Sequence, residues 1–196
     1  MIKNIATSLS EAEKAVANLI NNKNQLKNIE AGAESFIETL KSGGRIFSCG
    51  NGGSMSDAIH FAEELSGRYR KNRKPLPAMA ISDPGYISCV SNDFGYEYIF
   101  SRFLQAHGKP GDALLAISTS GTSKNVYNAA KYGKENNIKV ISLTGKKNSP
   151  IGEISTIDIC STAGKYADRV QELHIKIIHI IIELIEREIF PELYPD

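Results

Sequence analysis

The chain has 196 residues, enough for one domain with a sizeable core, and 23 Lys and Arg against 22 Asp and Glu leave a net charge of +1. That balance gives no electrostatic reason to expect nucleic acid or an anionic membrane as a ligand, so any anionic ligand must be met by a local site. The N-terminus has no apolar segment of the secretory type, and the most apolar stretch, 175–185, is too short and too polar to span a bilayer. We therefore expect a cytoplasmic protein.

Three cysteines, Cys49, Cys89 and Cys160, have no CxxC spacing, and each lies within or beside an apolar stretch. Such residues are typical of buried free thiols in a reducing compartment, and a catalytic cysteine is the weaker alternative.

Apolar residues at helical spacing predict two helices at the start of the chain, roughly 8–22 and 27–41, and Ser42-Gly43-Gly44 ends the second. Short β-type runs then alternate with helical patterns. The predicted strands are Arg45–Cys49, Ala78–Ser82, Ala113–Ser118, Lys139–Leu143 and Thr156–Cys160. The alternation predicts a parallel sheet with helices on both faces, a three-layer α/β sandwich. Ligands of such sheets bind at the carboxyl ends of the strands, near the switch in strand order.

Two loops at those strand ends are suited to an anion. Gly50-Asn51-Gly52-Gly53-Ser54 follows the first strand, and Ser118-Thr119-Ser120-Gly121-Thr122-Ser123 follows the third. Both lead into helices, so both offer backbone N–H groups at a helix N-terminus, and the second adds five hydroxyls. Neither has the lysine of a Walker A loop or the GxGxxG order of a dinucleotide fold, which favours a sugar monophosphate. Ordinary capped turns are the alternative.

Polar residues on two helices are candidate ligands. His60 and Glu64 are four residues apart, so they share a helix face and can bind one zinc ion, although a surface His–Glu pair has the same spacing. The last predicted helix, Ala167–Ile189, is apolar on nearly all sides, which predicts burial throughout and suggests an oligomer core. It carries Gln171, His174 and His179. Spacing does not choose between the two histidines, and either can be a hydrogen-bonded structural residue.

Asn92-Asp93 follows a short helical pattern at Tyr86–Ser91 and can bind sugar hydroxyls, but the same pair is common in turns.

Taken together, the chain resembles the bacterial sedoheptulose-7-phosphate isomerases (phosphoheptose isomerases) of the SIS-domain family. The resemblance covers nearly the whole chain, and its matching strings occur in order. Each string alone is weak evidence for the family, but together they are specific to it. These strings are Ser48-Cys49-Gly50-Asn51-Gly52-Gly53-Ser54, Asp57-Ala58-Ile59-His60-Phe61-Ala62-Glu63-Glu64-Leu65, Ala80-Ile81-Ser82-Asp83, Asn92-Asp93-Phe94-Gly95, Ile117-Ser118-Thr119-Ser120-Gly121, Leu143-Thr144-Gly145 and Tyr166-Ala167-Asp168-Arg169-Val170-Gln171-Glu172-Leu173-His174-Ile175-Lys176.

The resemblance implies a five-stranded, parallel, flavodoxin-like sheet in a single SIS domain over 1–196, with 1–42 as an N-terminal helical extension. It implies a homotetramer with active sites between subunits and one zinc ion per subunit. The implied zinc ligands are His60, Glu64, Gln171 and His179, and His179 is chosen over His174 by this match alone. The residues implied to contact substrate are Asn51, Gly52, Gly53, Glu64, Asn92, Asp93, Ser118, Thr119, Ser120, Ser123 and Gln171.

The implied reaction converts sedoheptulose 7-phosphate to D-glycero-D-manno-heptose 7-phosphate, the first step toward the heptose of lipopolysaccharide or a related glycan. It passes through an enediolate, for which we assign Glu64 as base and His179 as acid. The chain departs from the family pattern at Met55-Ser56 and in a longer C-terminal segment, 190–196. That segment also resembles a non-catalytic relative that binds the replication initiator, which is the alternative function. Such a scaffold does not need both Glu64 and His179.

Overall fold

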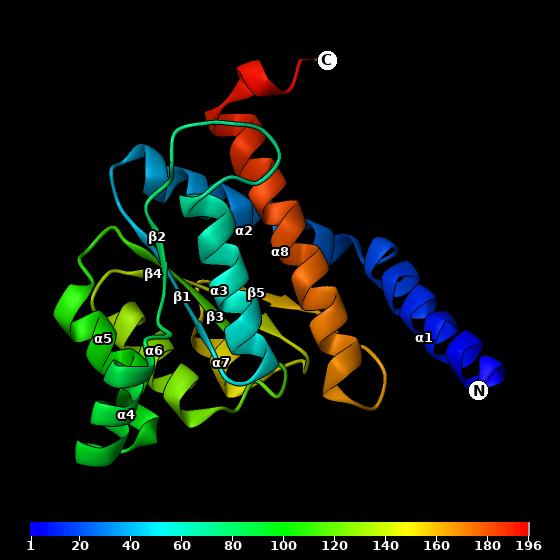
Figure 1. The fold of residues 1–196 in the computed structure, drawn as a ribbon, viewed down its shortest axis with the longest axis horizontal. Coiled ribbons are helices and arrows are strands. Elements are labelled where there is room, and N and C mark those ends of the chain that lie inside the picture. Colours follow the sequence, from blue (N-terminus) through cyan, green and yellow to red (C-terminus); the bar gives the residue numbers. More distant parts are fainter. Residues whose placement is uncertain (196) are drawn as a thin grey trace.

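The computed structural model describes residues 1–195, which form a five-stranded parallel sheet packed between helices (Figure 1). The strands are β1 (Ile46–Gly50), β2 (Ala78–Ala80), β3 (Ala113–Ser118), β4 (Lys139–Thr144) and β5 (Ile157–Cys160). The α-helices are α1 (Ile2–Ile20), α2 (Lys23–Lys41), α3 (Gly53–Ser66), α4 (Pro84–Asp93), α5 (Ile99–His107), α6 (Lys124–Glu135), α7 (Pro150–Ile154) and α8 (Ala167–Ile189). Short 3-10 helices, η1 (Tyr96–Tyr98) and η2 (Pro191–Leu193), complete the chain. The predicted three-layer α/β architecture is confirmed.

The strand order is β2-β1-β3-β4-β5, the flavodoxin-like order, and every pairing is parallel. The order reverses between β1 and β3, which lie side by side, so the loops that follow these two strands open at the switch point. The two loops rich in glycine and hydroxyl groups are these loops.

Alternate residues of the strands belong to two separate cores, one on each face of the sheet. On β3, Leu115 and Ile117 belong to the core with α1, α2, α3 and α8, whereas Leu114 and Ala116 belong to the core with α4 to α7. β1 and β3, in the middle of the sheet, are buried at every position, so they are mostly apolar runs rather than alternating ones.

The N-terminal helices extend further than predicted. α1 begins at Ile2, not near residue 8, and α2 begins at Lys23, because the Asn22 side chain caps it by accepting a hydrogen bond from the Gln25 amide. α2 packs on β5 and α8 as part of the layer, whereas α1 projects from the body of the molecule (Figure 1).

Two expectations are corrected by the fold. Asn92 and Asp93 do not follow a helix; they form the last turn of α4, which Asp83 caps and Pro84 starts. Cys89 is exposed, unlike the buried Cys49 and Cys160, because α4 is short and buries only Val90 fully. Within residues 1–195, no helix combines the length and the apolar character that crossing a membrane requires.

Candidate active site

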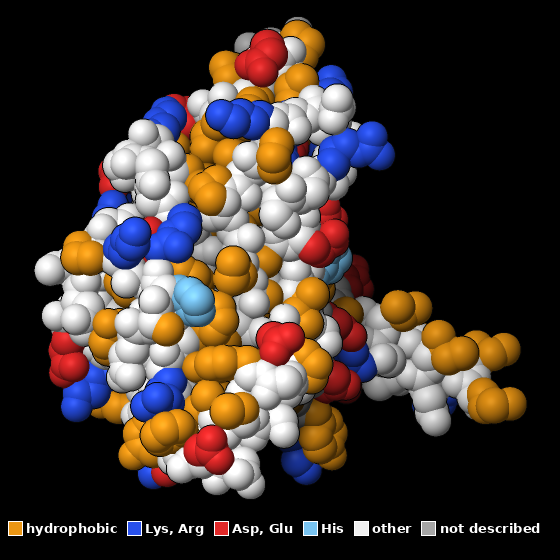
Figure 2. Space-filling view, turned by 60° about the vertical axis from the view of Figure 1, so that its left-hand side comes forward, with side chains coloured by type: hydrophobic (Ala, Val, Ile, Leu, Met, Phe, Trp, Pro, Cys, Tyr) orange, Lys and Arg blue, Asp and Glu red, His pale blue; other side chains and the backbone are white. Residues whose placement is uncertain are grey.

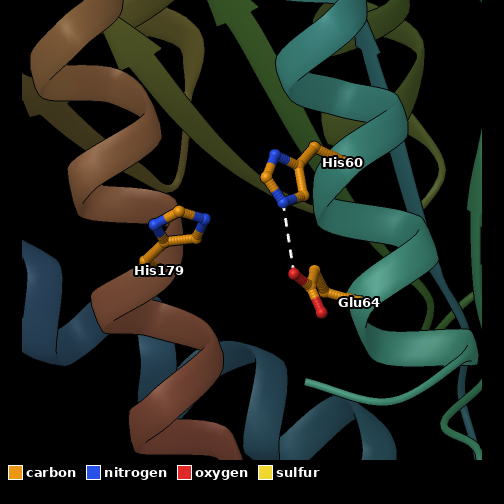
Figure 3. Close-up of side chains that lie close together, drawn as sticks. All are labelled: His60, Glu64 and His179. Carbon is orange, nitrogen blue, oxygen red and sulfur yellow. Dashed lines mark hydrogen bonds and ion pairs between the residues drawn. The ribbon is translucent and has the colours of Figure 1, made fainter. Parts of the chain in front are cut away.

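Two helices on the same face of the sheet carry the side chains that meet at the centre of the site. α3 contributes His60 and Glu64, and α8, which packs against it, contributes His179 (Figure 3). One ligand atom from each of the three residues lies within 4.8 Å of the other two. His60 Nε2 is 3.2 Å from Glu64 Oε1, and the His60 and His179 rings are 5.1 Å apart between centroids. The structure thus brings together three of the four predicted ligands, from positions 115 residues apart in sequence between Glu64 and His179.

The fourth predicted ligand, Gln171, lies two turns before His179 on α8 and faces the first loop. A Cβ atom on Gly53 would lie 2.6 Å from Gln171 Nε2, so only glycine permits this approach. Gln171 therefore lies against the start of α3, beside the first loop.

The two histidines of α8 have different environments. His174 is fully buried, and its Nε2 lies 3.3 Å from the carbonyl oxygen of Thr144 on β4. Its Nδ1 has no hydrogen-bond partner, and burial lowers its pKa to about 4. His179 is half-buried and faces the cluster. Burial and then repulsion by His60 lower its pKa, so the imidazole is neutral near pH 7. The geometry thus identifies His174 as a structural residue and His179 as the one available for chemistry, a distinction that residue spacing does not make.

The donor set of this cluster fits zinc. Two imidazole nitrogens and one carboxylate oxygen are the protein ligands typical of catalytic zinc sites, which leave a position for water or substrate. Neutral imidazole is also the form that ligates metal. The chemistry of these residues thus agrees with the predicted metal.

Several hydroxyl groups of residues 118–123, which we call the hydroxyl loop, lie within hydrogen-bond distance of one another. Ser118 Oγ lies 3.0 Å from Ser123 Oγ and 3.4 Å from Ser120 Oγ, and it accepts a hydrogen bond from the Gly121 amide. Ser123 is the N-cap of α6 but makes no side-chain capping bond, and the Val126 amide of the first turn donates instead to Asn125 Oδ1 at 2.9 Å. Thr119 and Ser120 line a cavity of about 380 Å³ with Lys146 and Lys165. The hydroxyls and the two cations around this cavity suit a phosphate.

Asn125 and Tyr96 are site residues that sequence reasoning missed. The amides of Asn125 and Asn51 exchange two hydrogen bonds, of 2.9 and 2.8 Å, and the Tyr96 hydroxyl donates to Asn51 Oδ1 at 3.0 Å. These bonds tie the first loop to the start of α6. Asn125 is only 3% exposed, and no motif marks it, because its role depends on a contact across the switch point.

The side chains of Asn92 and Asp93 are exposed at the end of α4. Asn92 Nδ2 donates to Asp93 Oδ1 at 2.8 Å, and the other Asp93 oxygen lies 3.7 Å from Cys89 Sγ. Among the described residues, these side chains do not hydrogen bond to either loop.

Asp57, one turn before His60 on α3, was also not singled out. Its Oδ2 atom is buried without a hydrogen-bond partner, and burial raises its pKa to about 6 despite the attraction of His60. A carboxyl group with this pKa beside the cluster marks the surroundings of His60 as an unusual electrostatic environment.

Comparisons with known proteins agree with this geometry. The SIS domain family matches residues 9–145. The phosphoheptose isomerase of Glaesserella parasuis serovar 5 (strain SH0165) is 53% identical over 94% of this chain and 96% of its own length. The phosphoheptose isomerase structure from Neisseria gonorrhoeae has a TM-score of 0.87 at 32% identity, covering 94% of this chain and 97% of that one. The phosphoheptose isomerase from Francisella tularensis has a TM-score of 0.88 at 29% identity, covering 95% and 98%. The resemblance seen in the sequence is confirmed, and the chain belongs to the phosphoheptose isomerases, a family of sugar-phosphate isomerases built on the SIS domain.

Proposed function

We propose that the protein converts sedoheptulose 7-phosphate to D-glycero-D-manno-heptose 7-phosphate, with one zinc ion per subunit. The observation that carries the proposal is the cluster of His60, Glu64 and His179, which lies on two helices, α3 and α8, that pack against each other. The phosphate would bind to the hydroxyls of that loop, and the open chain of the sugar would extend toward the cluster. Under this proposal the product feeds the synthesis of heptose for lipopolysaccharide or a related glycan.

His60, Glu64, Gln171 and His179 would hold the zinc ion, which when bound stabilises negative charge on the substrate oxygens. Glu64 takes a proton from C1 of the ketose, and the electron pair of that C–H bond forms the C1–C2 double bond of the enediolate. Glu64 then returns the proton to C2. His179 donates a proton to the oxygen on C2, and it recovers one from the oxygen on C1 as the aldehyde forms. The lowered pKa of His179 makes its protonated imidazole a stronger acid, although this form is the minority near pH 7.

We also propose that the protein acts as a homotetramer with active sites between subunits. α1 carries five exposed apolar residues that recur at helical spacing. They are Ile2, Ile5, Leu9, Val16 and Ile20, with exposed fractions of 39–83%. Figure 2 shows hydrophobic side chains along this projecting arm. A stripe of this kind gains stability by packing against another copy of the chain. Three unpaired cysteines agree with the reducing cytoplasm as its compartment.

The test is to incubate zinc-supplied protein with sedoheptulose 7-phosphate and follow the sugar by NMR. We expect an aldoheptose 7-phosphate from the unchanged protein and at least about a hundredfold less from Glu64→Gln, which keeps the shape of the side chain but not the base. Glu135→Gln is the control, because Glu135 is an exposed carboxylate at the end of α6 that pairs with Lys131, and it should keep full turnover. Equal turnover in both variants would remove Glu64 as base, and no conversion by a folded, zinc-bound protein would turn attention to the initiator-binding alternative.

A further inference from the structure

A buried ion pair joins the loop after α3 to α8. Arg73 Nε donates to Glu186 Oε1 at 2.7 Å, and the two side chains are 1% and 0% exposed. Arg73 lies in the loop between α3 and β2, and Glu186 lies two turns after His179 on α8. The core around them is apolar, and a buried ion pair there is costly unless its remaining donors and acceptors are satisfied.

The remaining donors of Arg73 are satisfied by the end of α3. Arg73 Nη2 donates to the carbonyl oxygen of Glu64 at 2.6 Å, and Nη1 donates to those of Leu65 and Gly67 at 2.8 and 3.0 Å. Glu64 and Leu65 lie in the last turn of α3, where carbonyls have no partner within the helix, and Gly67 is its C-cap. One guanidinium thus binds the backbone of Glu64 and pairs with the helix that carries His179. Both Glu64 and His179 are predicted zinc ligands.

The C-terminal segment covers this pair. The Tyr194 hydroxyl donates to Glu186 Oε2 at 2.6 Å, and the Phe190 ring centre lies 5.9 Å from the Arg73 guanidinium carbon. Burial and the Glu186 carboxylate raise the pKa of Tyr194 to about 12, so the hydroxyl remains a donor at any physiological pH. Lys71 adds a bond of 2.7 Å from its ammonium to the carbonyl oxygen of Leu193. In Figure 1 the loop after α3 arcs across the end of α8 and the last residues of the chain lie beyond it.

We propose that Arg73 and Glu186, sealed by Tyr194, are positioning residues that set the distance between α3 and α8 and therefore the geometry of the zinc site. The C-terminal segment, which had no assigned role, is then part of the support of the active site. A guanidinium is required because one group must reach three carbonyls and a carboxylate at fixed angles, which a lysine cannot do. The inference rests on the proposed zinc site. It adds to that site the residues that set the distance between its ligands.

The experiment measures zinc affinity by competition with a chromophoric chelator, and the absorption spectrum of the cobalt-substituted protein. We expect Arg73→Lys and Glu186→Gln to bind zinc about 10- to 100-fold more weakly, as loss of a supporting group typically does, and to shift the cobalt spectrum. Tyr194→Phe should weaken binding less, because it removes one bond at the rim. The double variant Arg73→Met with Glu186→Met removes both charges, so no unpaired buried ion remains to prevent folding. This variant therefore tests positioning in a stable protein.

Arg45→Met is the matched control. Arg45 also pairs with a buried carboxylate, Asp112 at 3.0 Å, and bonds to a carbonyl oxygen, but it joins the start of β1 to the start of β3, away from α8. It should lower thermal stability without changing zinc affinity. Folded Arg73 and Glu186 variants that bind zinc as tightly as the unchanged protein, with an unshifted cobalt spectrum, would overturn the inference.

A second readout separates this inference from the proposed zinc site. If the unchanged protein binds no zinc, the proposed site fails, and hydrogen exchange in the metal-free protein still tests the positioning pair. We expect the double Met variant to exchange faster in the last turn of α3 and in α8 together, while Arg45→Met does not. Unchanged exchange in both segments would contradict the role of the pair.

Discussion

The two halves of the candidate site are built in different ways. The hydroxyl loop consists of six consecutive residues, and four of their side chains bond to one another or to the backbone of the loop. The cluster of His60, Glu64 and His179 exists only because α3 and α8 pack together, since one of its residues is more than a hundred positions from the other two. A site can therefore combine a part that the local chain shapes with a part that depends on the packing of distant helices, and changes to packing should affect only the second.

Removing the metal should separate the two halves most clearly. With zinc removed by a chelator, we expect turnover to fall about 10²- to 10³-fold, because the charge developing on the substrate oxygens loses its main stabilisation. Inorganic phosphate should bind with unchanged affinity, since the hydroxyl loop does not depend on the cluster. Turnover assays and calorimetric titration with phosphate measure the two effects, and re-addition of zinc is the control. A parallel loss of phosphate binding would mean that the two halves form one structural unit.

Acid should destabilise the fold through His174, which lies on α8 but outside the cluster. Its pKa of about 4 in the folded protein lies below the ordinary value of 6.5, so between these values the unfolded chain binds more protons. Stability should therefore fall as the pH drops from about 6.5 to about 4, by on the order of 3 kcal/mol from this residue.

Urea unfolding of the metal-free protein at pH 7 and pH 4.5 measures this contribution. The variant His174→Leu should lose clearly less stability between the two pH values than the unchanged protein. His107→Gln is the control, because His107 is exposed on α5, and it should keep the full pH dependence. The same pH dependence in His174→Leu would locate the acid sensitivity elsewhere.

Changing the hydroxyl loop should affect binding and leave the metal alone. For Ser120→Ala we expect KM for the sugar phosphate to rise about 10-fold, the effect of one hydrogen bond to a charged group, with zinc affinity unchanged. Ser42→Ala is the control, because the Ser42 hydroxyl at the end of α2 donates only to the Thr39 carbonyl oxygen and lies before β1, outside both loops. A loss of zinc affinity in Ser120→Ala would contradict the independence of the two halves.

The smallest expected effect tests the link between the loops. Asn125→Ala removes the paired amide bonds that hold Asn51, so we expect KM to rise about fivefold while kcat changes little, the effect of about 1 kcal/mol. Asn128→Ala is a suitable comparison, because Asn128 lies one turn along α6 and bonds to the Glu97 carbonyl instead. Steady-state kinetics of both variants decide whether Asn51 needs this support.

Much of the site could be predicted because its motifs are local. Glycine at the turn after β1 and hydroxyls at the turn after β3 follow from what a strand-to-helix turn and an anion require, and both loops lie where the alternation of strands and helices placed them. The residues that escaped prediction, Asn125, Tyr96 and Arg73, make their contacts across the fold, so neither spacing nor composition marks them.

The sequence by itself determined the class of fold, the two loops and the pairing of His60 with Glu64, because hydrophobic periodicity and helix spacing depend only on neighbours in the chain. Spacing left open which histidine of α8 faces α3; the family resemblance chose His179, and only the tertiary structure shows the physical reason. Both belong to the same apolar helix, but the packing of α8 turns His174 into the core against Thr144 and leaves His179 half-buried beside His60. That choice depends on the rotation of one helix against its neighbours, which is a property of packing and not of local sequence.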